Sequence, residues 1–255
     1  MSEEVQDAAP VARRRFRLSE KQSKFAREVG SVVLGVLIAL GIGEVADWGR
    51  WQWRVSVSEA AMRAELSGSR FNFAERRSYQ ACMTQRLEDM GAILAEARRT
   101  HRLPDIADIG SPGRRPTLFG ALDSATSEGT LLHMRRERAN DYTGIYAMAR
   151  YYDAEIEQES QPWATLQLLV HAPGPIDGDL LATLLDAVAQ AKMHTRWVGV
   201  IAEQSDDELA RLGIGIQSLP AGATWQAITR DGPVTSVMCK PLVADGKPYR
   251  PAPAK

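Results

Sequence analysis

The hydropathy pattern of the chain is dominated by one apolar stretch, residues 29–45, with the sequence VGSVVLGVLIALGIGEV. Residues 29–43 carry no charge, and Glu44 and Asp47 follow in the next turn. A helix that crosses a bilayer needs about 20 residues, each adding about 1.5 Å. Residues 29–48 have this length, so we expect them to form a single transmembrane helix in contact with the lipid bilayer.

The residues on either side of this stretch predict its orientation. Arginines and lysines gather before it, in residues 11–28, whereas residues 44–63 hold three arginines and three acids. Basic residues favour the cytoplasmic side, so we expect the N-terminus in the cytoplasm and the C-terminal part in the periplasm of a bacterium, with the helix in the inner membrane. Trp48, Trp51 and Trp53 follow the stretch, as is typical of a membrane interface.

Two other interpretations of the apolar stretch stay open. A cleaved signal peptide would make the protein a soluble periplasmic one, and a buried helix of a soluble core would have a similar composition. However, the basic segment before the stretch is long for a signal peptide, and no A-x-A cleavage site follows the stretch. We therefore prefer an uncleaved anchor.

Small residues recur at every fourth position within the apolar stretch. Ser31, Gly35, Ala39 and Gly43 would form one stripe on a helix, which lets a second helix approach closely. This pattern suggests a homodimer through the membrane helix. The alternative, of equal weight, is that small residues are simply common in membrane helices.

A second hydrophobic pattern begins at residue 62 and predicts a long helix over residues 49–100. Its seam alternates steps of four and three, and it is apolar at both ends but polar in the middle. Because a polar centre disfavours a simple coiled coil, we expect the two ends to pack on other helices of this chain. The seam consists of Met62, Leu66, Ser69, Phe73, Arg76, Gln80, Met83, Leu87, Met90, Leu94 and Ala97.

Charged residues between the seam positions are interpreted as a solvated face of mixed sign. They are Arg63, Glu65, Arg70, Glu75, Arg77 and Glu88. Acids further along the chain are interpreted in the same way. Asp153, Glu155, Glu157 and Glu159 would be spread around a helix surface, and Asp206 and Asp207 would stand at a helix start.

The rest of the chain alternates helical patterns with proline- and glycine-rich breaks. We expect a loop over 101–116, a short helix over 118–126 capped by Thr117, a helix over 130–160 and a shorter one over 163–170. One face of the 130–160 pattern is apolar and aromatic, which is typical of a core; it consists of Tyr142, Ile145, Ala149, Tyr152 and Ile156. A further helix is expected to begin at Asp177 or Asp179, with a Ser205–Glu208 capping box and a stop at Gly213.

These patterns predict an all-α fold. We divide it into a short basic cytoplasmic tail (1–28), a transmembrane helix (29–48), a long juxtamembrane helix (49–100) that continues the span, a small helical bundle (101–213) and an irregular tail (214–255). The tail is expected to be extended, with Trp225 and Cys239 as anchor points and a short strand pairing between residues 224–229 and 235–238.

Cys82 and Cys239 are the only cysteines, and both fall on the expected periplasmic side. Because that compartment is oxidising, we expect them to form one long-range disulfide rather than two free thiols. The four histidines show no metal-ligand spacing with either cysteine, so no metal site is expected.

The segments EVGSVVLGVLIALGIGEVADW and RAELSGSRFNFAERRSYQACMTQRL resemble a group of uncharacterised single-pass proteobacterial membrane proteins. The proteins of this group share one layout: a basic N-terminus, a membrane helix, an arginine- and glutamate-rich helix and a helical external part. LFGALDSATSEGTLLHM is similar too, without the tryptophan expected near its start. The resemblance implies the topology, but no assigned activity and no site residue.

The sequence contains no nucleophile elbow, P-loop or HExxH motif, and its net charge of −1 gives no bulk attraction to nucleic acid. We therefore expect no enzyme, no catalytic residues, no cofactor and no nucleic-acid partner. Two hypotheses follow. The first is an interaction or scaffold module that binds an unknown envelope protein, and the second is a ligand-sensing domain that signals through a separate partner.

Overall fold

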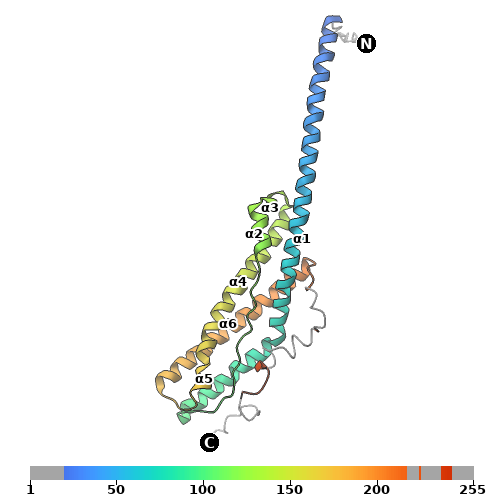
Figure 1. The fold of residues 1–255 in the computed structure, drawn as a ribbon. Helices are drawn as coiled ribbons and strands as arrows, with labels where there is room; N and C mark the ends of the chain where they lie inside the picture. The colour runs from blue at the N-terminus through green and yellow to red at the C-terminus, as the bar shows by residue number, and fades with distance from the viewer. Residues whose placement is uncertain (1–19, 217–223, 225–236, 243–255) are drawn as a thin grey trace, which may run out of the picture. The chain divides into compact units, whose positions relative to one another are not determined.

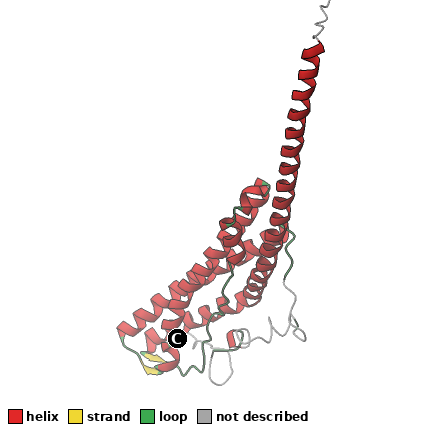
Figure 2. Cartoon of the chain, turned by 45° about the horizontal axis from the view of Figure 1, so that its top comes forward, coloured by secondary structure: helices red, strands yellow, loops and turns green. Residues whose placement is uncertain are grey.

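The computed structural model describes residues 20–216, 224 and 237–242. Its described helices are α1 (Glu20–Thr100), α2 (Gly120–Ser127), α3 (Thr130–His133), α4 (Arg136–Leu166), α5 (Leu168–His171) and α6 (Gly178–Arg211) (Figure 1). Two short strands, β1 (Arg102–Leu103) and β2 (Gly174–Pro175), pair antiparallel (Figure 2). The predicted all-α class, with a long helix beginning near the N-terminus, is confirmed.

The chain divides into two compact units, residues 1–52 and residues 53–255. In the first unit, α1 carries the apolar stretch with its side chains uncovered: Val32 is 66% exposed and Leu40 62%. Within the described residues, one helix is long and apolar enough to cross a membrane, and none of its apolar window is buried. This supports the first step of the predicted topology, a candidate span near the N-terminus.

The second unit is built on three long helices, α1 from Trp53 onward, α4 and α6 (Figure 1). Tyr142 of α4 reaches Glu59 of α1, and Glu159 of α4 reaches Arg76, so α4 runs parallel to α1. Asp206 of α6 reaches Arg70, and Lys192 reaches Glu88, so α6 runs antiparallel to both. The three helices therefore enclose the core from three sides.

The predicted seam of α1 is the buried face of this helix. Of its eleven positions, all are buried except Gln80, which is half-buried. Met62, Leu66 and Phe73 belong to one hydrophobic cluster, and the positions from Met83 to Ala97 belong to a second. The prediction that the two ends pack on other helices of the same chain is confirmed, because α4 and α6 contribute to both clusters.

The first cluster, next to Trp53, contains the tyrosine face of α4. Tyr142, Ile145, Ala149, Tyr152 and Ile156 are all buried, as the periodicity predicts, and Tyr146 is buried beside them. Tyr152 meets Phe73 edge to face, with ring centroids 4.8 Å apart, which is a favourable aromatic geometry. The second cluster adds Trp163 of α4, Leu169 of α5 and the buried face of the first half of α6.

Several predicted helix ends are wrong because tertiary contacts override local signals. Thr117 does not cap α2; its backbone N–H and its hydroxyl both donate to the Asp153 carboxylate. Ser205 lies inside α6, buried, so no capping box forms there. The break expected after residue 160 is also absent, since α4 continues through Pro162 to Leu166.

The two ends of α6 agree with the sequence. Asp177 caps the first turn by accepting a hydrogen bond from the Leu180 N–H at 2.8 Å. At the other end Gly213 has φ +65°, Ile214 N–H donates to Leu209 O, and Gly213 N–H donates to Ala210 O. This is a Schellman motif, which favours glycine because its backbone is left-handed there.

The segments expected to be irregular supply part of the core. Residues 101–116 contain β1 and bury Ile106 and Ile109. In the C-terminal region Met238 and Leu242 are buried in the second cluster, and Val237 and Met238 are helical rather than part of a strand. Trp225 and most of the expected strand pairing fall outside the described residues.

Candidate functional site

The centre of the second unit holds a buried ion pair between α1 and α4. Arg76 donates from Nη1 to Glu159 Oε2 at 2.9 Å and from Nη2 to Glu159 Oε1 at 2.6 Å. The two side chains are 1% and 0% exposed. This bidentate geometry is the strongest that an arginine makes with a carboxylate. The pair lies where the two hydrophobic clusters meet.

Side chains from α1 and α6 complete the hydrogen bonding around this pair. Thr195 donates its hydroxyl to Glu159 Oε1 at 2.6 Å, and Arg76 Nε donates to Gln80 Oε1 at 3.0 Å. Gln80 in turn donates from Nε2 to the backbone carbonyl of Thr195 at 2.8 Å. The four residues, which we call the central network, tie all three long helices together.

Gly199 of α6 makes room for the central network. A Cβ built at this position would stand 2.6 Å from Gln80 Nε2 and 2.7 Å from Gln80 Cδ. Any larger residue would therefore push the Gln80 amide away from Thr195. The glycine is explained by this close approach of two helices, since no left-handed backbone is needed there.

Burial and charge act in opposite directions on the groups around the network. Desolvation by itself lowers the pKa of Arg76, but the Glu159 carboxylate and two nearby tyrosines more than offset it, so its pKa is raised above the ordinary value. Burial also raises the pKa of Tyr79 and of Tyr152. Arg76 and both phenols therefore hold their protons throughout the physiological pH range.

The acids of α4 were expected around a helix surface, and this expectation is wrong for two of them. Glu155 is 8% exposed and Glu159 is fully buried. Glu155 Oε2 lies 3.0 Å from His194 Nδ1 of α6, a second contact between these helices beside the central network. Spacing along one helix cannot reveal these partners, because they come from α1 and α6.

Most of the charged residues of α1 that were interpreted as a solvated face are only partly exposed and bind other segments of the chain, whereas Arg77 and Glu88 remain exposed. Arg70 and Arg77 both bind Asp206, at 2.7 and 2.5 Å, and Asp206 lies near the end of α6 rather than at a helix start. Arg63 donates to the Gly213 carbonyl at 2.6 Å. Glu65 accepts from the Tyr146 hydroxyl at 2.7 Å. The sequence correctly places these charges on α1 but not their partners.

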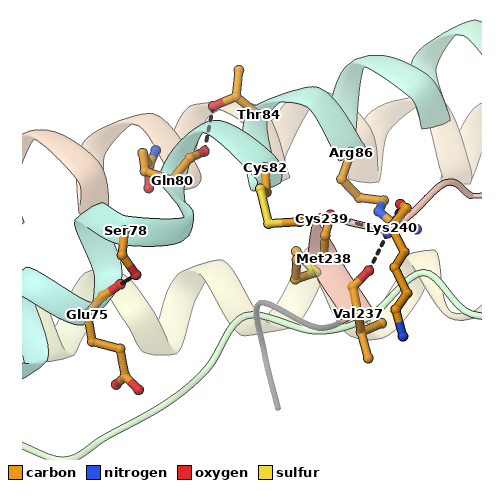
Figure 3. Close-up of a disulfide and its surroundings, with 10 residues drawn as sticks. All are labelled: Glu75, Ser78, Gln80, Cys82, Thr84, Arg86, Val237, Met238, Cys239 and Lys240. Atoms are coloured by element: carbon orange, nitrogen blue, oxygen red, sulfur yellow. Dashed lines mark hydrogen bonds between the residues drawn. A yellow bond between two sulfur atoms is a disulfide. The ribbon is translucent and has the colours of Figure 1, made fainter. Parts of the chain in front are cut away.

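The predicted disulfide between Cys82 and Cys239 is present, with a sequence separation of 157 residues (Figure 3). One turn further along α1, the buried Arg86 donates to the carbonyl oxygens of Asp108, Val237, Met238 and Lys240. Burial lowers the pKa of Arg86. Together the disulfide and this arginine hold residues 237–240 against α1.

A groove of about 520 Å³ opens beside the central network, between α1 and α6. Gln80 and Thr195 form part of its wall, and Lys192 and Glu88 form an ion pair across it at 2.9 Å. Arg196 and Glu203 also line it. Polar and charged residues outnumber apolar ones in its lining, and the groove meets the outer surface of α6.

That outer surface of α6 is apolar and uncovered. Met193 is 51% exposed and Trp197 50% exposed, and Val200 lies between them and the groove. Ala189, one turn before Met193, is exposed as well. We call these four residues the α6 face. Arg196 flanks the α6 face, so this surface combines the exposed indole of Trp197 with a positive charge.

The residues predicted for membrane contact all lie on α1. Ser31, Gly35, Ala39 and Gly43 are exposed, and among the described residues no atom outside the helix's own backbone comes within 4 Å of a Cβ built at Gly35 or Gly43. Trp48 and Trp53 are 66% and 68% exposed, whereas Trp51 is half-buried. Among the described residues, no group of three His, Cys, Asp or Glu side chains is arranged to hold a metal ion.

Comparisons with known proteins give no relative from which a role could be transferred: no family model, no curated protein and no solved structure matches this chain.

Replacing Arg76 with Met should lower the free energy of unfolding by about 3–5 kcal/mol, because Glu159 is left buried without a counter-charge. The double variant Arg76→Met/Glu159→Met should recover most of that loss. The measurement is denaturant unfolding of the full chain in detergent, followed by tryptophan fluorescence. Arg77→Met is the matched control, and we expect it to cost under about 1 kcal/mol because Arg77 is 41% exposed. Equal losses from Arg76→Met and Arg77→Met would contradict the assigned role of the central network.

Proposed function

We propose that this protein is a single-pass inner-membrane protein whose second unit lies in the periplasm and binds another protein of the cell envelope. In this proposal the apolar stretch of α1 stays uncleaved and the N-terminus is cytoplasmic. The protein has no catalytic role and requires no cofactor. The α6 face is the observation that carries the binding role.

Three features support the anchor and its orientation. The side chains of the apolar stretch are uncovered along its length, which suits contact with lipid tails and would be costly in water. The Cys82–Cys239 disulfide suits an oxidising compartment, and the basic residues before the stretch suit the cytoplasmic side. All three point to the same topology.

The chemistry of the α6 face favours one kind of partner. Trp and Arg are enriched in binding surfaces because each combines large apolar area with a polar group. Trp197 and Met193 supply the area, and Arg196 supplies a charge beside them. We therefore propose that the partner is a protein segment carrying apolar residues together with a carboxylate.

The groove favours ligand sensing as a second candidate. Gln80 and Thr195 belong both to its wall and to the central network, so a bound ligand would contact the groups that join α1 to α6. Helical bundles often bind small molecules between helices. A melting temperature of the full chain that rises with a metabolite pool would favour sensing over protein binding.

The anchor and topology can be tested together by maleimide labelling in intact cells, using a full-length protein with an N-terminal tag. We expect Cys82 and Cys239 to react only after reduction, because the disulfide blocks both, and we expect the tag to be retained. The labels are read as a gel shift. Loss of the tag would identify the stretch as a cleaved signal peptide, and labelling without reduction would contradict the disulfide.

Self-association through the membrane helix can be tested with Gly35→Leu/Ala39→Leu. A Cβ at Gly35 meets no other side chain in the described part of this chain, so the change is aimed at contacts with a second copy. We expect the yield of cross-linked dimer in membranes to fall severalfold. Val36→Leu, next to Gly35 but outside the small-residue stripe, is the control. An unchanged dimer yield would remove the homodimer from the proposal.

The α6 face can be tested with a photo-cross-linking residue in place of Trp197 in the full-length protein in cells. We expect one discrete adduct, lost when Arg196→Glu is added, and its partner should bind the purified full chain in a second assay. The same probe in place of the exposed Gln158 on α4 is the control. An adduct with the mass of two copies would make the partner a second copy, and no adduct would overturn the proposed surface.

A further inference from the structure

The connection between α2 and α4, residues 128–135, carries the most exposed of the large hydrophobic side chains in the described part of the chain. We call this connection the corner. Leu132 of α3 is 87% exposed. Its neighbours are not: Leu131 packs against the first hydrophobic cluster, and Met134 is 7% exposed. The corner is therefore fixed to the core on both sides of Leu132, while Leu132 itself is held outward in water.

The corner lies level with the beginning of the second unit. Helix α2 starts beside Glu65, which accepts from the Ala121 N–H. Glu128, which follows the last residue of α2, shares a shallow surface groove with Trp53, Arg54 and Val57. Helix α4 then starts with Arg138 bound to Glu59 at 2.8 Å. In Figure 1, α3 accordingly lies at the end of the bundle where the second unit begins.

The beginning of the second unit cannot be far from the predicted membrane. Trp53 follows Trp48, the last residue of the predicted span, by five positions. Even a fully extended chain covers only about 18 Å over five residues. A bilayer adds a headgroup layer of about 5–8 Å to each side of its hydrocarbon core. Trp53 and Val57, which line the shallow surface groove beside Glu128, are 68% and 49% exposed, so the corner has further apolar neighbours near the membrane.

Three arginines follow the exposed leucine closely in the chain. Arg135, Arg136 and Arg138 follow it in sequence, against the acids Glu128 and Glu137, so residues 128–138 carry a charge of +1 (three arginines minus two glutamates) while the whole chain carries −1. The side chain of Arg135 is 86% exposed, and its contact with Glu137 is a loose one at 3.6 Å. An exposed leucine next to arginines is complementary to lipid tails beneath anionic headgroups.

We propose that this corner is a second membrane contact. Leu132 enters the boundary between headgroups and acyl chains, and Arg135 and Arg136 bind phospholipid phosphates. The proposal rests on the membrane anchor proposed above, which brings the corner close to the bilayer. A span alone leaves a domain free to turn about one attachment, whereas two contacts hold it in one orientation on the membrane surface.

The test uses the full chain in lipid nanodiscs, with an environment-sensitive fluorophore on a single introduced cysteine and spin-labelled lipids as quenchers. The native cysteines are blocked by their disulfide. We place the label at Leu132→Cys, with Val36→Cys as the control for the span and Leu185→Cys, an exposed leucine near the start of α6, as the control for distance. We expect the lipids to quench the label at 132 severalfold more than the label at 185.

The charge of the corner is tested in the same discs. Adding Arg135→Glu and Arg136→Glu should reduce the quenching at 132 in discs that contain phosphatidylglycerol, and have less effect in phosphatidylcholine alone. If the label at 36 is quenched but 132 matches 185, the anchor stands and the second contact is wrong. If the label at 36 is not quenched, the anchor itself fails, and the second contact fails with it.

Discussion

The buried pair of Arg76 and Glu159 is the constraint on which the rest of the second unit depends. Removing two charges from water costs several kcal/mol for each, and the pair offsets this cost only while its geometry and its remaining hydrogen bonds are complete. Gln80 and Thr195 complete them, and Gly199 gives Gln80 the space to do so. The hydrogen bonds of the pair are therefore complete at only one arrangement of the three helices relative to one another.

The central network also explains why the core has two parts. Apolar side chains fill the space on either side of it, with Phe73 and the tyrosines of α4 in the first cluster and Trp163 in the second. The second cluster is closed by a segment distant in sequence, residues 237–242, which the disulfide and Arg86 attach to α1. In the chain-entropy model, a disulfide that closes a loop this long stabilises the fold by about 4–5 kcal/mol.

The sequence predicts the α1 side of this arrangement well and its partners poorly. Steps of fours and threes identified most of the buried face of α1 from Met62 to Ala97, including Ser69 and Arg76 in its polar centre, because burial follows helical periodicity. Tyr79, Arg86 and Ile93 are buried as well, although they lie off the predicted seam. No periodicity marks Glu159 as different from Glu157, since the difference lies in which helix each carboxylate meets. For the same reason the caps predicted at Thr117 and Ser205 do not form. The Thr117 hydroxyl donates to Asp153 instead, and Ser205 is buried within the continuous helix α6.

The central network also bears on the choice between the two proposed functions. A receptor of the sensing kind transmits a signal when one helix slides or turns against its neighbours, and a full step of that kind moves a helix by about 5 Å. Such a shift of α1 would break both hydrogen bonds between Arg76 and Glu159 and would separate Arg70 and Arg77 from Asp206. Breaking a buried pair is strongly unfavourable, so α1 from Trp53 onward moves with α4 and α6 as one body. A rigid body with an uncovered α6 face suits protein binding better than signal transmission along α1.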